Sequence, residues 1–166
     1  MEDFAAHIPR LRRYARALTG ERFLADDLVQ DTLERALAKF SLWRTTGRLE
    51  SWLLTMMHNV FINQIRSRAS RPPETLLDDT TVEPVVRGAQ SDRLELRDLD
   101  NALNALPPEQ REVLLLVTLE ELSYEETARS LDLPVGTVMS RLSRARDRLR
   151  QLLDGSAASI ALKVVK

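Results

Sequence analysis

The chain has no cysteine, and its other scarce residues narrow the possible structures further. Without cysteine there is no disulfide framework, no cysteine zinc site and no thiol nucleophile, and only His7 and His58 remain for histidine chemistry. Aromatic residues make up 5% of the chain, with 5 glycines and 7 prolines, a composition that disfavours β-sandwich and collagen-like structures. No apolar run approaches the roughly 18 to 20 residues that span a bilayer. Glu2 and Asp3 open the chain where an export signal would be basic. We therefore expect a soluble, helical protein that is not secreted.

The net charge of −1 conceals a strong segregation of charge along the chain. Residues 44–71 carry a net +4, residues 72–133 a net −10, and residues 134–166 a net +5. A local basic stripe, rather than the overall charge, attracts a phosphate backbone. The two basic blocks are therefore candidate nucleic-acid surfaces, although each block alone is explained equally well by a solvated helix face.

A segment rich in helix-breaking residues divides the chain in two. Between Arg71 and Arg97, three prolines and Gly88 interrupt every periodic pattern, and acidic residues accumulate. Such a segment is too long for a loop within a compact domain. The sequence thus predicts an all-α protein with two small helical domains joined by a flexible acidic linker. The expected divisions are a first domain at 1–70, a linker at 71–97, a second domain at 98–154 and a tail at 155–166.

Three amphipathic helical patterns fill the first domain. The first runs from Phe4 to Leu18 and stops near Gly20, and the third begins near Leu49. The second has an apolar stripe and an opposite acidic strip. The stripe comprises Val29, Leu33, Ala36, Leu37 and Phe40, and the acidic strip comprises Asp27, Gln30, Asp31 and Glu34. We expect the apolar stripes of the three helices to form the core of the first domain.

The third helix also carries a polar strip at helical spacing. Its members are Ser51, Thr55, Asn59, Asn63 and Arg66. Amides offer a donor and an acceptor to base edges, arginines bind the phosphate backbone, and the aromatic residues Phe40, Trp43 and Trp52 lie nearby in sequence. Together these are the groups that bind single-stranded DNA, although a merely hydrated helix face would look the same.

The second domain has the pattern of a helix-turn-helix. Leucines at 96, 99, 103 and 106 precede Pro107 and Pro108, which end one helix and begin another over 109–119. Ser123 and Glu126 have the spacing of a capping box, which predicts a short helix through Leu131. A longer helix follows over 137–153. Ala128 and Val138 supply the small and the branched apolar residue that the crossing of the two helices needs.

The outward side chains of that last helix are polar or basic, and five arginines lie between residues 141 and 150. An α-helix fits the major groove of B-DNA, where its first residues reach base edges and later arginines contact phosphates. An arginine-rich surface helix in an ordinary bundle is the alternative. The order of short helix, turn and basic helix favours DNA binding.

At this point the residues resemble a known family. The run LSYEETARSLDLPVGTVMSRLSRARDRL closely resembles region 4.2 of the extracytoplasmic-function sigma factors, a branch of the sigma-70 superfamily of bacterial RNA polymerase, and ALPPEQREVLLLVTLEEL resembles region 4.1. In the first half, DDLVQDTLERALAKF resembles region 2.2, and LESWLLTMMHNVFINQIRSR resembles regions 2.3 and 2.4. The resemblance covers nearly the whole chain.

The resemblance implies a dissociable polymerase subunit that selects promoters and has no active site of its own. The first domain would read the minus-10 element as a melted strand, and the second would read the minus-35 element as duplex. Residues implied to bind the polymerase core are Asp27, Gln30, Asp31 and Glu34. Residues implied to bind the minus-10 element are Trp43, Thr55, Asn59, Asn63 and Arg66. Residues implied to bind the minus-35 element are Thr137, Met139, Ser140, Arg141, Ser143, Arg144, Arg146 and Arg148.

The implied partners are macromolecules. They are the polymerase core, through the clamp helices of its β′ subunit and the flap of its β subunit, promoter DNA, and an anti-sigma factor of the kind that is often membrane-tethered in relatives. No cofactor, metal or small-molecule substrate is expected. The expected location is the bacterial cytoplasm, or the membrane surface if an anti-sigma partner holds the protein there.

Other classes of protein remain open from the sequence. A helix-turn-helix repressor or activator would explain the second half, but it needs a dimer interface, and no spare apolar stripe is evident. A sigma-mimicking protein that only sequesters an anti-sigma factor would explain both halves, but it need not keep Asn59 or the arginines of the last helix. An enzyme is the weakest alternative, because the two histidines lie on separate helices without metal-ligand spacing.

Overall fold

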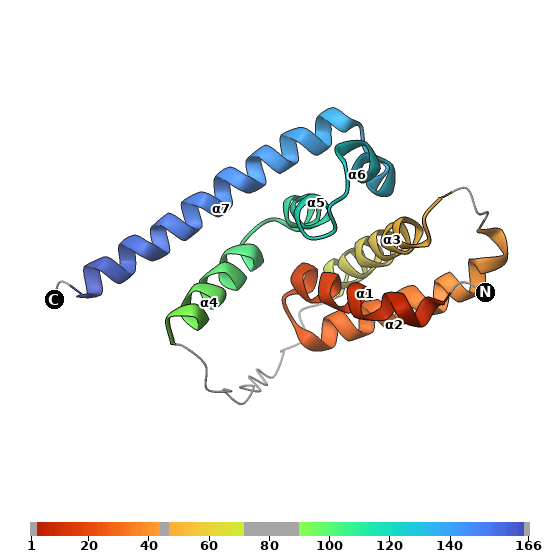
Figure 1. Cartoon of the computed structure of the whole chain (residues 1–166), viewed down its shortest axis with the longest axis horizontal. Helices are drawn as coiled ribbons and strands as arrows, with labels where there is room; N and C mark the ends of the chain where they lie inside the picture. The colour runs from red at the N-terminus through yellow and green to blue at the C-terminus, as the bar shows by residue number, and fades with distance from the viewer. Residues whose placement is uncertain (1–2, 44–46, 72–89, 165–166) are drawn as a thin grey trace.

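The computed structural model describes residues 3–43, 47–71 and 90–164, and the regular elements within these ranges are all helical (Figure 1). The prediction of an all-α fold is confirmed. The first domain contains α1 (Phe4–Thr19), α2 (Arg22–Lys39), the short 3-10 helix η1 (Phe40–Leu42) and α3 (Leu49–Ala69). The second contains α4 (Gln90–Asn104), α5 (Pro108–Thr118), α6 (Tyr124–Leu131) and α7 (Val135–Val164).

Local signals in the sequence set several helix ends. The Asp3 side chain accepts a hydrogen bond from the Ala5 backbone N–H at 2.9 Å and caps α1. Gly20 ends α1 with a left-handed φ of 73°, a conformation that glycine adopts without steric cost. At α6, Ser123 and Glu126 form the predicted capping box, with backbone bonds of 2.8 and 3.1 Å. These helices therefore begin and end largely where local chemistry places them.

Two helices extend beyond their predicted bounds. Helix α4 begins at Gln90, inside the segment 71–97 that the sequence analysis assigns to a linker, because no proline or glycine interrupts residues 90–104. Helix α7 continues through the predicted tail to Val164, since a single glycine, Gly155, is tolerated among good helix formers. Residues 72–89 of the expected linker lie outside the described residues.

The first domain packs α1 and α3 against α2 around a buried set of aliphatic side chains. From α2 this set includes Leu28, Val29 and Ala36. The spacing of apolar residues predicts that Leu37 also belongs to this buried stripe, and that prediction is wrong, because Leu37 is 60% exposed. Its neighbour Ala36 is fully buried, and one residue further along α2 turns the side chain about 100° away from the core.

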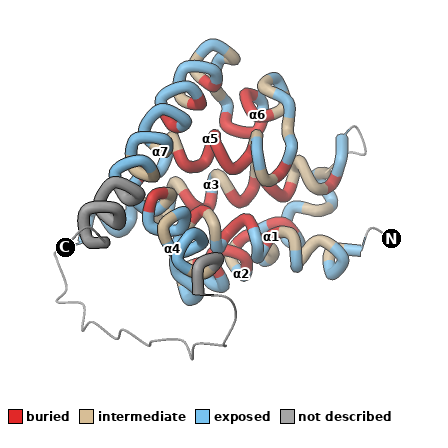
Figure 2. Tube along the Cα trace, turned by 60° about the vertical axis from the view of Figure 1, so that its left-hand side comes forward, coloured by how far each residue is buried: buried red, intermediate tan, exposed pale blue. Residues whose placement is uncertain are grey.

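The two domains share one core in this structure. Buried residues run from α1 and α3 into α5, and from there to α6 and α7 (Figure 2). Helix α1 contacts α4 and α5, and α3 contacts α6. At one contact, a Cβ atom at Gly20 would lie 2.1 Å from Oδ1 of Asn104 on α4, so a side chain at this position would require the Asn104 side chain to move. The domains are therefore packed directly on each other.

A buried arginine joins the domains through backbone carbonyls. The Arg111 guanidinium on α5 donates to the oxygens of Leu18 at 2.7 Å, Leu103 at 2.7 Å, Asn104 at 2.8 Å and Leu106 at 3.0 Å. The first lies at the end of α1 and the next two at the end of α4, where backbone carbonyls lack helical partners. Burial lowers the pKa of Arg111 from its ordinary value. One cation thus caps two helices from different domains.

No helix among the described residues is both long enough and apolar enough to cross a membrane.

Candidate nucleic-acid interfaces

Helix α3 presents the predicted polar strip along one side. Asn59, Asn63 and Arg66 are exposed, whereas Ser51 and Thr55 are half-buried. The opposite side of α3 is the core of the domain, with Leu53, Val60 and other apolar residues buried. The amides and the arginine therefore point to solvent, where a nucleic-acid strand could reach them. The Thr55 hydroxyl donates to the Ser51 carbonyl at 2.9 Å and so is already engaged within the helix.

Aromatic rings lie at the N-terminal end of this strip. Phe40 stacks on Trp43 with ring centroids 5.6 Å apart, and Trp43 lies 6.2 Å from Trp52. Trp43 and Trp52 line a cavity of about 630 Å³ together with Thr55. An unstacked base is recognised by stacking on such rings, so the cavity has the right chemistry for a flipped base. The other wall of this cavity belongs to α6, which includes Glu126 and Arg129.

Helices α6 and α7 form the predicted helix-turn-helix. Ala128 and Val138, the two residues expected at the helix crossing, are both buried. The turn begins at Asp132, which has a left-handed φ of 53° that glycine more often supplies. Pro134 then precedes the first turn of α7. The sequence-based placement of this motif is confirmed by the helix bounds.

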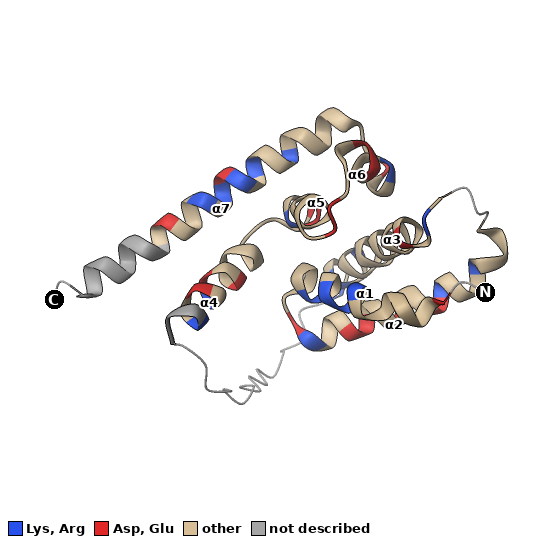
Figure 3. Ribbon diagram, viewed as in Figure 1, with Lys and Arg blue, Asp and Glu red and all other residues tan. Residues whose placement is uncertain are grey.

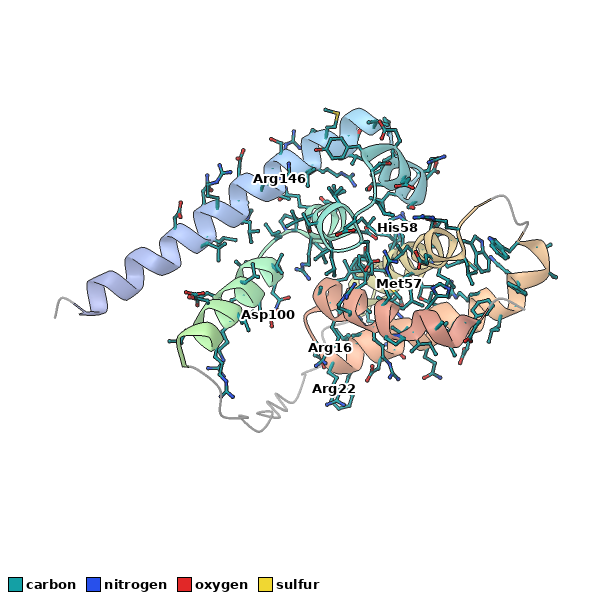
Figure 4. The ribbon with its side chains drawn as sticks, viewed as in Figure 1. Arg16, Arg22, Met57, His58, Asp100 and Arg146 are labelled. Carbon is teal, nitrogen blue, oxygen red and sulfur yellow. The ribbon has the colours of Figure 1, made fainter. Side chains whose placement is uncertain are left out.

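The face of α7 predicted to contact DNA is largely open to solvent. Met139 is 51% exposed. Its predicted companions Ser140, Ser143, Arg144, Arg146 and Arg148 are exposed as well, and Thr137 is half-buried. Arginine positions recur along the middle of α7, with acidic positions among them (Figure 3), and Arg146 lies on this part of the helix (Figure 4). The helix therefore offers a basic surface that fits a phosphate backbone.

Arg141 differs from the other predicted minus-35 arginines. It is half-buried where they are exposed, and its charge lowers the pKa of Glu112 on α5, partly opposing the rise that burial causes. Arg141 therefore faces the interior of the second domain as well as its surface. We expect a smaller contribution to DNA binding from Arg141 than from Arg144.

Helix α2 carries the predicted acidic strip on its outer face. Asp27, Gln30 and Glu34 are exposed, and the Gln30 amide donates to Glu34 at 3.2 Å. Asp31 is half-buried because it accepts a hydrogen bond from Gln64 of α3 at 3.0 Å. The strip thus contains three exposed polar side chains, Asp27, Gln30 and Glu34, and one, Asp31, that also holds α2 on α3.

Two apolar residues at the ends of this strip were not predicted. Phe23 is 73% exposed and Leu37 is 60% exposed. They continue the strip of Asp27, Gln30 and Glu34 at steps of four and three residues, so all five share one side of α2. The same spacing in the sequence could have found Phe23. Leu37 was predicted to be buried instead, because its position in the sequence also fits the spacing of the apolar stripe that contains Leu33 and Ala36.

Three polar contacts between the domains were also missed by sequence reasoning. His58 lies on α3 (Figure 4), and its Nδ1 is 2.6 Å from Oε1 of Glu112 on α5. Arg10 on α1 donates to Glu120. Arg111 is the third. No group of metal-binding side chains occurs among the residues that the structure describes.

Comparison with known proteins places this architecture in a family. A model of "Sigma-70, region 4" matches residues 96–149, and one of the "Sigma2 domain of PhyR" matches residues 4–58. The extracytoplasmic-function RNA polymerase sigma factor EcfG of Rhodopseudomonas palustris (strain TIE-1) is 37% identical over 154 residues, 92% of this chain and 83% of EcfG. The chain belongs to the extracytoplasmic-function sigma factors. The family resemblance of the sequence motifs is confirmed. This sigma factor is also 36% identical to SigM of Mycobacterium tuberculosis (strain ATCC 25618 / H37Rv), over 90% of the chain and 74% of SigM.

Solved structures resemble this sigma factor over most of its length. The sigma factor RpoE of Bartonella quintana, in complex with the anti-sigma factor NepR, has a TM-score of 0.72 and 35% identity, with 90% of this chain and 93% of that chain covered. CnrH in complex with the cytosolic domain of CnrY has a TM-score of 0.64 and 28% identity, with 91% and 84% covered. PhyR of Sphingomonas sp. Fr1, in complex with NepR, has a TM-score of 0.63 but only 22% identity over 90% of this chain and 85% of that one, which is a likeness of fold.

Proposed function

We propose that this chain binds the core of RNA polymerase and directs transcription initiation by reading a minus-10 and a minus-35 element. The observation that carries the proposal is the presence of two different DNA-compatible surfaces in one chain. Exposed amides beside arginine and tryptophan on α3 suit unstacked bases, whereas the basic helix α7 suits a major groove. A chain with both surfaces can hold a duplex at one element while it binds a melted strand at another.

The proposed assignments follow the two domains. Residues 1–70 bind core polymerase and the minus-10 strand, and residues 98–154 bind the minus-35 duplex. The proposed minus-10 residues are Trp43, Thr55, Asn59, Asn63 and Arg66. The proposed minus-35 residues are Thr137, Met139, Ser140, Ser143, Arg144, Arg146 and Arg148, with Arg141 in a lesser role. We assign the chain no reaction and no cofactor of its own.

The proposed docking surface for the polymerase clamp helices is the outer side of α2. Its exposed carboxylates favour a basic partner surface and would speed the encounter. Phe23 and Leu37, at opposite ends of the strip, supply apolar area that a polar strip alone lacks. We include both as contacts with polymerase, because exposed apolar anchors commonly contribute much of the affinity of a protein interface.

Loss of either apolar anchor should weaken polymerase binding without unfolding the chain. Burial of a leucine or phenylalanine side chain contributes about 1.5 to 3 kcal/mol, so Phe23→Ser and Leu37→Ser should each weaken core binding roughly tenfold or more. Leu94→Ser is the matched control, because Leu94 is 55% exposed on α4, away from the strip. Titration of labelled variants with core polymerase measures the affinities. Equal affinity for all three variants would contradict this docking surface.

Control by an anti-sigma factor is a further part of the proposal. RpoE, at 35% identity, was solved with the anti-sigma factor NepR bound. CnrH, at 28% identity, was solved with the cytosolic domain of CnrY bound. We propose that a comparable protein sequesters this chain in the bacterial cytoplasm, or at the membrane if that partner is tethered there. Co-purification from the native host tests this part.

A second candidate function is favoured by the match of residues 4–58 to the sigma2 domain of PhyR. PhyR of Bartonella quintana is described as an anti-anti-sigma factor. On that model the chain would bind an anti-sigma factor and never direct transcription. The identity to PhyR structures of 20% to 22% is well below the 37% to EcfG, which favours the first function.

In vitro transcription from a pooled promoter library separates these functions. Core polymerase with this protein should yield transcripts from a subset of promoters that share a minus-10 and a minus-35 sequence, and core alone should not. Transcription that stays the same with and without the protein would overturn the proposal. Capture of an anti-sigma factor by such an inactive protein would favour the second function.

Asn59→Ala tests the minus-10 surface. Asn59 is exposed in a helix where alanine is the better helix former, so the free energy of unfolding should not fall. Loss of one base contact should weaken open-complex formation by about 1 to 3 kcal/mol. Permanganate footprinting of the melted strand measures this, with the exposed helical Asn101→Ala on α4 as control. If Asn59→Ala and Asn101→Ala form open complexes equally well, Asn59 does not read the strand.

A further inference from the structure

Helix α7 exposes a large apolar side chain among polar ones near its beginning. Met139 is more than half exposed, whereas its neighbours Val138 and Leu142 are buried in the core. These two buried residues already fix this part of α7 on the second domain. The fold therefore does not require an apolar residue at position 139, and the Met139 side chain is open to a ligand.

Met139 lies on a different side of α7 from Arg144. Five residues separate them, and an α-helix turns by about 100° per residue, so their directions differ by about 140°. Met139 instead shares its side with Ser143, Arg146 and Arg150, which follow it at steps of four, three and four residues. When α7 lies in a major groove, Met139 and Arg144 therefore face different parts of that groove.

A hollow of about 190 Å³ lies beside Met139, between α6 and α7. Its apolar lining consists of Tyr124 from α6 together with Met139 and Leu142 from α7. Tyr124 packs against the core, so the fold holds this lining in place. Because both helices of the helix-turn-helix form the hollow, it lies where the first turns of α7 would meet DNA.

The charged groups around this hollow suit a neutral ligand better than a phosphate. Asp147 lines the hollow together with Arg146 and Arg150, and its carboxylate lies 3.8 Å from Nη1 of Arg150. A carboxylate repels a phosphate and offsets part of the positive charge of the arginines. The edge of a base carries no net charge, so it meets no such repulsion.

Only one group in the major groove matches an apolar lining. Guanine, cytosine and adenine present hydrogen-bond donors and acceptors there, whereas thymine presents one acceptor and a C5-methyl group. Methionine is unbranched and polarisable, so its side chain adapts to the position of a methyl group. The nearby Ser140 hydroxyl donates to the Thr137 carbonyl at 3.1 Å, so its hydrogen is already engaged within the helix.

We propose that Met139, with Tyr124 and Leu142, forms a subsite for the C5-methyl group of one thymine in the minus-35 element. This inference rests on the proposed function, which places α7 in the major groove. Met139 is then a determinant of promoter specificity. It selects thymine at one position of one strand, because the other three bases offer no methyl group there.

Deoxyuridine tests this subsite, because it differs from thymidine only in lacking the C5-methyl group. The preferred minus-35 element is first selected from a library with wild-type holoenzyme. Each thymine of either strand is then replaced singly by deoxyuridine, and competition binding measures the affinity of the holoenzyme. At one position the replacement should weaken wild-type binding about threefold to fivefold, which is the effect of losing roughly one buried methyl group.

Variants at position 139 show whether this penalty belongs to Met139. Met139→Ala should abolish the penalty at that position, whereas Met139→Leu, which keeps a large apolar side chain, should retain it. Arg144→Ala is the matched comparison on the other side of α7. It should weaken binding but leave the penalty unchanged. Circular dichroism checks that each variant keeps its helices, and alanine is the better helix former at this exposed position.

The outcomes separate this inference from the proposed function. The inference alone is overturned by an equal penalty in wild type and Met139→Ala, by no penalty at any thymine, or by a selected element without thymine in either strand. Selection of a defined element by the holoenzyme would in each case still support the proposed function. Failure of the chain to bind or transcribe any promoter with core polymerase would instead overturn the proposed function.

Discussion

Arg111→Met should lower the free energy of unfolding by about 3 to 5 kcal/mol, one of the largest effects of any single substitution in this chain. The arginine donates to four backbone carbonyls, at the ends of α1 and α4 and at Leu106. Methionine fills similar volume but donates nothing, so the carbonyls lose the arginine as a donor, although the Leu103 carbonyl keeps the Leu106 N–H at 3.2 Å. Each such loss costs roughly 1 to 3 kcal/mol, and carbonyls that regain water cost less.

Urea denaturation followed by circular dichroism measures this loss. Arg150→Met is the control, because Arg150 is exposed on α7 and its Nη1 lies 3.8 Å from the exposed carboxylate of Asp147. An exposed pair of this kind contributes little, so the control should stay within about 0.5 kcal/mol of the wild-type chain. If Arg111→Met were as stable as Arg150→Met, the capping of α1 and α4 by Arg111 would not contribute to the fold.

Arg144→Ala should cost about 1 to 3 kcal/mol of minus-35 binding and relax the preference at one or two base pairs. Arg144 lies seven residues after Thr137 and therefore on the same side of α7, with its side chain exposed. A guanidinium there can reach a guanine edge with two hydrogen bonds. Selection of a minus-35 library with variant holoenzyme measures the preference at each position.

Arg148→Ala should act differently, because Arg148 is exposed one further turn along α7, where we expect it to contact flanking phosphates rather than bases. It should weaken all sequences alike and reduce the salt slope of duplex binding by about one unit, since one phosphate contact releases about one counterion. Repeating the selection at two salt concentrations separates the two roles. A uniform loss of affinity in Arg144→Ala, with the preferred sequence unchanged, would make Arg144 a phosphate contact and leave specificity to Ser140, Ser143 and Met139 or to DNA shape.

Most helices of this protein could be predicted from the sequence, because their signals are local. The spacing of apolar residues, the capping box of Ser123 and Glu126, and the stop at Gly20 each act within one or two turns. The same holds for the exposed strips, since Asn59, Asn63 and Arg144 point outward once the core side of each helix is known. Leu37 shows the limit of this reasoning. Periodicity gives the direction of a stripe but not its width, and the neighbours of α2 cover Ala36 without reaching Leu37.

The sequence by itself determined the helices, the helix-turn-helix and the family, because each depends on neighbouring residues or on continuous motifs. Only the tertiary structure decided how the two domains pack and which charges hold them together. His58 and Glu112 are 54 residues apart in sequence, Leu18 and Arg111 are 93 apart, and Arg10 and Glu120 are 110 apart. No local pattern marks such partners. A buried glutamate or arginine resembles a solvated one until the fold removes water from it, and its partner then decides whether the charge is stable.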